Sequence, residues 1–190
     1  MNEWIDWFQR VLDVSIRLYF RQECDLSSVY DIPLPKAGPL WKALLPEQVD
    51  PTFDEWMVLM LALMPHLSPQ MLDILFVHNK NFDRPYTEFG GWKGLSHGGF
   101  LPTGETAVFL LAGDRVERRL EVVRLFREEH WFHMYHVVGL EGAGNGEPFL
   151  SGQLRISEDF LYRLSFEGEY KPDYNMGFPA KRISTALNWE

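Results

Sequence analysis

The segment from Thr52 to Pro65 constrains the fold of this chain more than any other. Thr52 and Glu55 have the spacing of a capping box, in which each side chain bonds the backbone of the other at a helix N-terminus. The predicted helix behind them is apolar nearly all round, with Phe53, Trp56, Met57, Met60, Leu61 and Met64. Such a helix is stable in water only when other elements cover every side of it. The sequence therefore predicts a helix that ends at Met64-Pro65 and is the most buried helix of the fold.

The rest of the chain is expected to form more helices, followed by a small antiparallel hairpin. We expect helices at 1–22, at 69–77 with Ser68 as N-cap, at 103–112 with Gly113 as its stop, at about 114–126 and at 158–164 behind Ser157, with one helical turn near 41–45 in a proline-rich connector. Strands are expected at 130–140 and 149–156, round a turn at 142–148, and at 180–189. This order indicates an α+β fold that is mainly helical with a small antiparallel β-hairpin wing, which is winged-helix-like. We divide it into an N-terminal helical lobe, 1–79, and a second lobe, 80–190, which holds a glycine-rich loop and the wing.

Composition excludes several classes of protein. A net charge of −9 and a pI near 5.1 over 190 residues argue against a charge-driven grip on nucleic acid, and equally against anionic membrane surfaces. The single cysteine, Cys24, cannot build a disulfide framework or a four-thiolate metal site. Glu3 and Asp6 stand where a secretory signal would be basic. We therefore expect a cytoplasmic protein with no membrane contact and with nucleic acid as an improbable partner.

The glycine-rich loop at 78–102 leads into a segment that is almost a phosphate-binding P-loop. Residues 99–106 match the P-loop at both glycines and at Thr106, but Glu105 replaces the lysine that would reach the phosphates. A carboxylate at that place repels an anion. Thr103 and Glu105 are instead expected to be an N-cap and a first-turn acid of the next helix. The sequence predicts that this segment does not hydrolyse ATP.

Polar residues of the same loop form a second candidate site. Asp83, Arg84, Glu88, Ser96, His97 and Glu105 are candidates for one polar cluster. The favoured interpretation is an internally hydrogen-bonded loop that pins the helices, with its glycines in tight turns. Disruption at Gly90 or Gly99 should then unfold or misdock the domain if those residues need positive φ angles. The alternative is a small hydrolase that uses His97 with Asp83 or Glu88.

Two further patterns have a functional and a structural interpretation. His130, His133 and His136 are spaced too widely on a strand or a helix for all three to bind one metal, so we expect them to be structural or solvated. Arginines between 115 and 127 resemble a DNA-recognition helix, but glutamates alternate with them. That pattern is typical of a solvated, ion-paired face. A DNA-binding winged helix is therefore kept as a second alternative, beside the small hydrolase.

A block of motifs in the second lobe is similar to a known family. The residues are Glu88-Phe89-Gly90-Gly91, Gly94, His97, Gly99, the run from Phe100 to Thr106, and Phe109 to Gly113, followed by Leu150-Ser151-Gly152, Phe178-Pro179-Ala180 and Trp189-Glu190. They resemble the N-terminal, variant winged-helix domain of bacterial AAA-type ATPases.

The resemblance implies a non-catalytic accessory domain, and so no enzyme activity, no cofactor and no metal in this chain. ATP and Mg would belong to an AAA module beyond Glu190, where we expect a domain boundary. The partners it implies are that AAA module and a protein client. The residues that would carry such a role lie in the motif loop, namely Asp83, Arg84, Glu88, Gly90, Gly91, His97, Gly99, Thr103 and Glu105.

Overall fold

A computed structural model describes residues 1–165, and the strand expected at 180–189 lies outside these residues. The first part of the chain is helical, with α1 (Asn2–Tyr19), η1 (Val29–Asp31), α2 (Pro39–Leu44), α3 (Phe53–Leu67) and η2 (Pro69–Phe76), where η denotes a 3-10 helix. The motif loop then forms two short hairpins, β1 (His78–Asn79) with β2 (Arg84–Pro85), and β3 (Trp92–Lys93) with β4 (Phe100–Leu101), on either side of η3 (Thr87–Phe89).

The second part of the chain alternates short helices with a third hairpin. It contains α4 (Gly104–Ala112), α5 (Val116–Val123), η4 (Arg124–Phe126), α6 (Trp131–Met134), β5 (Val138–Glu141), η5 (Phe149–Ser151), β6 (Gln153–Ile156) and α7 (Glu158–Ser165). β5 and β6 pair in antiparallel fashion, with Val138 opposite Ile156. The expectation of a mainly helical α+β fold with small antiparallel hairpins is confirmed for the described residues.

Helix α3 has nine buried residues, the most of any helix in residues 1–165, but it is not the most buried helix by share, because eight of the nine residues of α4 are buried. The Thr52 hydroxyl accepts from the Glu55 amide (3.4 Å), and the Glu55 carboxylate accepts from the Thr52 amide (2.6 Å), so the capping box is present. Every residue from 56 to 64 is buried. The expected end at Met64-Pro65 is wrong, since the helix continues to Leu67. Proline in the last turn removes only one backbone donor, and the Ser68 amide closes the helix on the Met64 carbonyl (2.9 Å).

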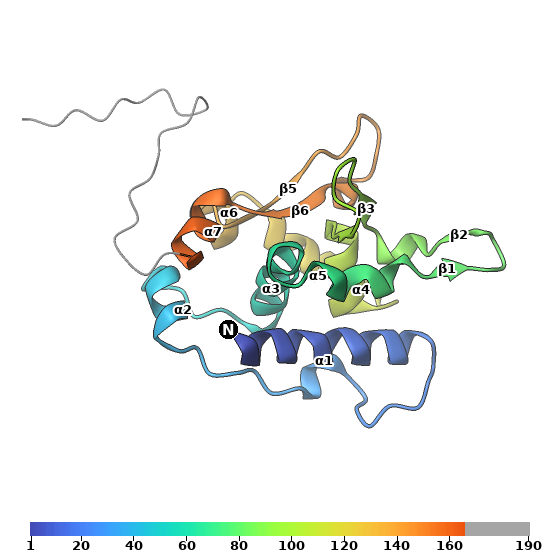
Figure 1. Ribbon diagram of the computed structural model, residues 1–190, viewed down its shortest axis with the longest axis horizontal. Coiled ribbons are helices and arrows are strands. Elements are labelled where there is room, and N and C mark those ends of the chain that lie inside the picture. Colours follow the sequence, from blue (N-terminus) through green and yellow to red (C-terminus); the bar gives the residue numbers. More distant parts are fainter. Residues whose placement is uncertain (166–190) are drawn as a thin grey trace, which may run out of the picture.

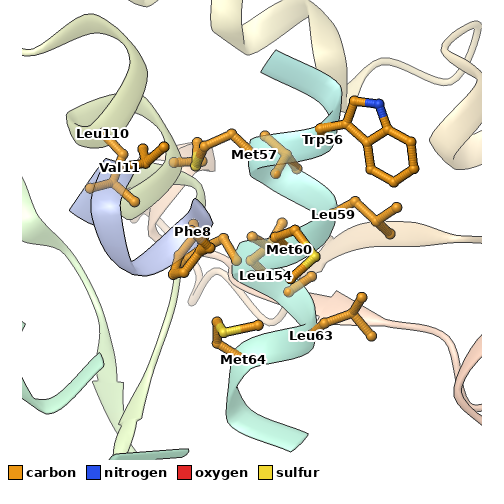
Figure 2. Close-up of a cluster of buried hydrophobic side chains, with 14 of the residues drawn as sticks. Phe8, Val11, Trp56, Met57, Leu59, Met60, Leu63, Met64, Leu110 and Leu154 are labelled. Atoms are coloured by element: carbon orange, nitrogen blue, oxygen red, sulfur yellow. The ribbon is translucent and has the colours of Figure 1, made fainter. Parts of the chain in front are cut away.

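Elements from both predicted lobes cover α3. Figure 2 shows Phe8 and Val11 of α1, Leu110 of α4 and Leu154 of β6 gathered round Met57, Met60 and the other α3 side chains. In Figure 1, α1 runs along one side of α3 and the β5–β6 hairpin lies on the opposite side. The buried residues of both lobes belong to a single hydrophobic cluster, so the lobes pack against each other.

Tryptophan side chains join the three N-terminal helices. The rings of Trp4 and Trp56 have centroids 4.0 Å apart, and Trp41 lies 5.6 Å from Trp4 and 5.0 Å from Trp56. Burial of such large rings is a major part of the hydrophobic stabilisation. It also explains why the predicted turn near 41–45 is helical, since α2 carries Trp41 and Leu44 into the core.

Four predicted elements differ in the structure. The strand expected at 130–140 is wrong over its first half, because His130 caps α6 and only Val138–Glu141 is extended. Residues 149–151 form η5 rather than strand. The helix behind Ser68 is a 3-10 helix, and the Ser68 side chain does not cap it. The charged helix at 114–126 begins later, at Val116, and ends in η4. Ser157 does cap α7, since its hydroxyl accepts from the Phe160 amide (3.2 Å).

Within residues 1–165, no single helix is long and apolar enough to cross a bilayer. Helices α3 and η2 reach the required length and composition only together, and the chain bends by 106° between them.

Candidate functional site

The N-terminus of α4 is capped by two buried threonines. The Thr103 hydroxyl accepts from the Thr106 amide (3.4 Å), and the Thr106 hydroxyl accepts from the Thr103 amide (3.0 Å). Both side chains are almost fully buried, at 2% and 0% exposure. The Gly104 amide donates to the Gly152 carbonyl (3.1 Å). The predicted N-cap at Thr103 is therefore confirmed, and these three amides are bonded within the protein.

A glycine turn occupies the space in front of this helix end. The Thr106 hydroxyl donates to the Phe89 carbonyl (2.8 Å), and the Gly91 amide donates to the Thr103 hydroxyl (3.2 Å). Gly90 has φ +61° and ψ −145°, a conformation that is essentially restricted to glycine. Because the Phe89–Gly91 turn is bonded to both threonines, the helix end that resembles a P-loop is filled by the protein itself. We call this the threonine-glycine lock, defined by Phe89, Gly90, Gly91, Thr103 and Thr106.

Both glycines of the lock are needed for space as well as conformation. A Cβ at Gly90 would overlap the Thr103 hydroxyl and lie 2.8 Å from the Glu105 Cβ. Gly91 has φ +89°, and a Cβ there would overlap the Phe100 ring, which is buried. The motif-loop glycines at 90 and 91 thus allow the loop to lie directly on α4.

Aromatic side chains pack against the other side of the turn. Phe89 is buried, with its ring centroid 4.4 Å from that of Phe109 on α4 and 5.1 Å from that of Tyr19 on α1. Tyr86 stacks on Phe89 at 5.0 Å. The loop between η2 and α4 is therefore part of the folded core over this stretch, although Phe82 at the β1–β2 turn is exposed.

Glu105, at the position of the P-loop lysine, forms an ion pair. Its carboxylate accepts from the Arg119 guanidinium of α5, and this hydrogen bond raises the pKa of Arg119. The Glu105 side chain is 19% exposed and that of Arg119 is 37% exposed. A carboxylate that is held here, at the first turn of α4, interacts favourably with the helix dipole and repels an incoming phosphate.

His97 lies apart from the lock, in the β3–β4 turn. Its Nε2 is buried and has no hydrogen-bond partner in the described part of the chain. Gly94 and Gly99 make room for the ring, since a Cβ at Gly94 would lie 3.2 Å from the His97 Cβ and one at Gly99 would lie 2.9 Å from Nε2. Gly90 has a positive φ but Gly99 does not, so a glycine at position 99 is required by the close approach of His97 and not by the backbone conformation.

The remaining predicted residues are separated from His97. Asp83 is at the β1–β2 turn with φ +49°, and Arg84 lies over the exposed Phe82 ring at 5.6 Å. Glu88 accepts a hydrogen bond from the Tyr19 hydroxyl, and burial together with this bond raises the pKa of Tyr19. Within residues 1–165, no hydrogen bond or ion pair joins His97 to Asp83 or Glu88. The structure therefore does not assemble the carboxylate–histidine set of the hydrolase alternative.

The three later histidines are also divided. His133 and His136 are exposed, with ring centroids 6.1 Å apart, whereas His130 is mostly buried. The described residues contain no group of three or more His, Cys, Asp or Glu that could hold a metal. His130 instead caps α6, because its Nδ1 accepts from the Phe132 amide (3.2 Å).

A buried cluster around Glu55 was not predicted. One carboxylate oxygen of Glu55 is 3.0 Å from His130 Nε2 and accepts from Trp131 Nε1 (2.5 Å), while the other bonds Thr52. Burial alone would raise the pKa of Glu55, but the hydrogen bonds from His130, Thr52 and Trp131 outweigh it and lower the pKa to about 2. His130 is 75 residues away from Glu55 in the chain, so no local sequence pattern predicts this contact.

The arginines of α5 that resembled DNA contacts are partly used inside the protein. Arg118 donates to Glu121 (2.7 Å) and to the Tyr30 hydroxyl (2.6 Å), and it pairs with Asp54 of α3. Burial, and next the charge on Asp54, raise the pKa of Tyr30 to about 12 although Arg118 opposes this. These bonds fasten α5 to the core, as Arg119 does through Glu105.

The fold and the lock together define a mainly helical α+β domain whose glycine-rich block builds structure. No protein-family model matches the chain, and no curated protein or solved structure matches it either.

Proposed function

We propose that this chain is a non-catalytic, protein-binding domain with a winged-helix-like arrangement. The order of elements supports this arrangement, since α3, the segment 100–103, α4, α5, β5 and β6 follow one another. The segment before α4 lies against β6, with the Leu154 amide donating to the Pro102 carbonyl (2.8 Å) and Thr103 bridged to Gln153. A helical core with an extended segment bridged to a two-stranded hairpin resembles the inventory of a winged helix. In this arrangement α5 occupies the place of the recognition helix.

The single observation that carries the proposed function is the outer face of α5. Val116 and Leu120 are one helical turn apart and are each 63% exposed, while Arg118 and Arg119 are turned into ion pairs with the core. Glu117 and Glu121 flank the apolar pair. An exposed apolar pair beside carboxylates suits a protein surface better than a phosphate backbone.

The lock and the family resemblance supply the rest of the proposal. A helix end that is closed by Gly90, Gly91 and Thr103 has no cradle for a phosphate, so the glycine-rich block serves the fold and not catalysis. The resemblance to AAA-type N-terminal domains suggests that the partner is a client or adaptor and that the chain couples it to an ATPase ring in the cytoplasm. ATP and Mg then belong to the ring, and the α5 face is the surface offered to protein.

A photo-crosslinking amino acid at position 120 tests this proposal in the cells that make the chain. Position 74 is the matched control, because Ile74 is also an exposed apolar residue (52%) but lies on η2. We expect a discrete protein adduct from position 120, reduced at least fivefold by Val116→Glu, and none of the same mass from position 74. Mass spectrometry of an adduct that contains an AAA module supports coupling to a ring. A nucleic-acid adduct, or no protein adduct at position 120, overturns the proposal.

A further inference from the structure

An open groove of about 410 Å³ follows the β5 strand. The lining includes the run from Val137 to Glu141, Leu125 and Phe126 of η4, and His133 and His136. Phe149 and Arg155 complete the lining. At the middle of the strand, Gly139 leaves the groove wide, since a Cβ there would meet no atom within 4 Å. The volume is in the range of ligand pockets, and a β-strand lines it.

The hydrogen-bond register shows which backbone groups of β5 point away from β6. The Ser157 amide donates to the Val137 carbonyl (2.9 Å), so this pair is of the hydrogen-bonded type. In an antiparallel ladder the two types alternate, and therefore Gly139 and Glu141 bond β6 while Val138 and Leu140 direct their N–H and C=O groups away from it. The Leu154 amide confirms this register, because it points away from β5 to Pro102.

The two edges of the hairpin differ in how they are covered. The β6 edge is covered at its start by the segment 102–104. In residues 1–165, no hydrogen bond reaches the outward groups of Val138 and Leu140 on β5. An unpaired strand edge is a template for another extended chain.

The charges of the groove select the kind of chain. Glu128 has no ion-pair partner among the described residues, and Glu141 is paired with Arg155 (2.7 Å). These two carboxylates outnumber the one arginine, so the glutamate and arginine side chains of the lining together carry a net negative charge. The apolar part of the lining includes Leu125, Phe126 and Phe149.

We propose that this groove binds an extended peptide with alternating apolar and basic residues, which adds a third strand to the outer edge of β5. The peptide backbone bonds the outward N–H and C=O groups of Leu140, which is half-buried, and those of Val138, which is 5% exposed and must become accessible on binding. These bonds supply sequence-independent affinity. Its basic side chains lie near Glu128, and its apolar side chains cover Phe126 and the space over Gly139. This groove is separate from the α5 face, and we expect it to bind the peptide whether or not α5 binds a protein.

The test is a titration of the full-length chain with acetyl-Val-Lys-Val-Lys-Val-Lys-amide, followed by amide NMR and hydrogen exchange. We expect slowed exchange at Val138 and Leu140, with Gly139 and Glu141 unchanged because their amides already bond β6. Gly139→Leu fills the groove and should weaken binding at least tenfold. Gly98→Leu is the matched control, since a Cβ at Gly98 also meets nothing within 4 Å, and it should bind as the wild type does.

Two control peptides distinguish strand addition from nonspecific peptide binding. Replacing the lysines with glutamate should weaken binding at least tenfold through repulsion by Glu128. Replacing the central valine with proline, which removes a backbone donor, should weaken it comparably. Equal binding of these peptides, protection centred on α5, or no binding of the lysine peptide would each overturn the proposal.

Discussion

Replacement of Gly90 by alanine tests the threonine-glycine lock. Gly90 lies at φ +61° and ψ −145°, where a side chain is strained by about 1–3 kcal/mol. The new Cβ would also overlap the Thr103 hydroxyl and crowd the Thr106 amide at 3.1 Å, and overpacking of this kind typically costs about 1–3 kcal/mol more. Both effects act together, so we expect Gly90→Ala to lower the free energy of unfolding by about 4 kcal/mol.

The matched control is Gly98→Ala in the neighbouring turn. A Cβ at Gly98 meets no atom within 4 Å, and its φ is outside the positive region. An exposed substitution of this sort changes stability by about 0.5 kcal/mol at most. Comparison of the two variants separates the effect of the lock from the general effect of replacing a glycine in this loop.

Urea unfolding followed by tryptophan fluorescence measures both variants, because the chain has seven tryptophans and several lie in the core. A small domain has a total stability of about 5–15 kcal/mol, so the expected loss at Gly90 is easily resolved. A loss below about 1 kcal/mol for Gly90→Ala, or an equal loss for Gly98→Ala, would show that this turn is not locked on α4.

Two further predictions concern charged groups in the core and on α4. The Glu55 carboxyl has a folded pKa of about 2 against an ordinary value of 4.5, which corresponds to roughly 3 kcal/mol that is present above pH 5 and is lost as the pH falls towards 2. Urea unfolding from pH 7 to pH 2 should therefore show Glu55→Gln less stable than wild type above pH 5 and nearly equal to it at pH 2; a difference independent of pH would contradict the assignment. Glu105→Lys places a cation beside Arg119, and we expect a loss of about 1 kcal/mol in the same assay at neutral pH, reversed by adding Arg119→Glu. No recovery in the double variant would show that the pair does not hold α5.

The elements that local patterns dictate could be predicted from the sequence. The capping box at Thr52, the N-cap at Thr103 and the stop at Gly113 depend on residues within one or two turns of each other, and all three are present. The strand predicted from His130 onward was wrong over its first half, although its aromatic and β-branched residues favour a strand. The His130 ring instead caps α6 and reaches Glu55 on α3.

Some residues of the candidate site could likewise be predicted from local patterns, and others could not. Thr103 and Glu105 could be assigned because a helix N-terminus has a sequence signature. The requirement for glycine at position 91 could not, because it arises from the Phe100 ring, which the β3–β4 hairpin brings back over the loop. His97, Asp83 and Glu88 are close in sequence but are placed on different turns and partners, so spacing alone suggested a cluster that the fold does not form.

We expect the glycine-rich block to build the fold and not to cradle a phosphate. Calorimetric titration with Mg-ATP, together with a phosphate-release assay, tests it on the wild-type chain and on Glu105→Lys. We expect no heat of binding and no phosphate release from either protein, because Gly90 and Gly91 occupy the α4 N-terminus whichever residue follows Gly104. Saturable ATP binding by the wild type, or hydrolysis that appears with the lysine, would show that this helix end does hold a phosphate.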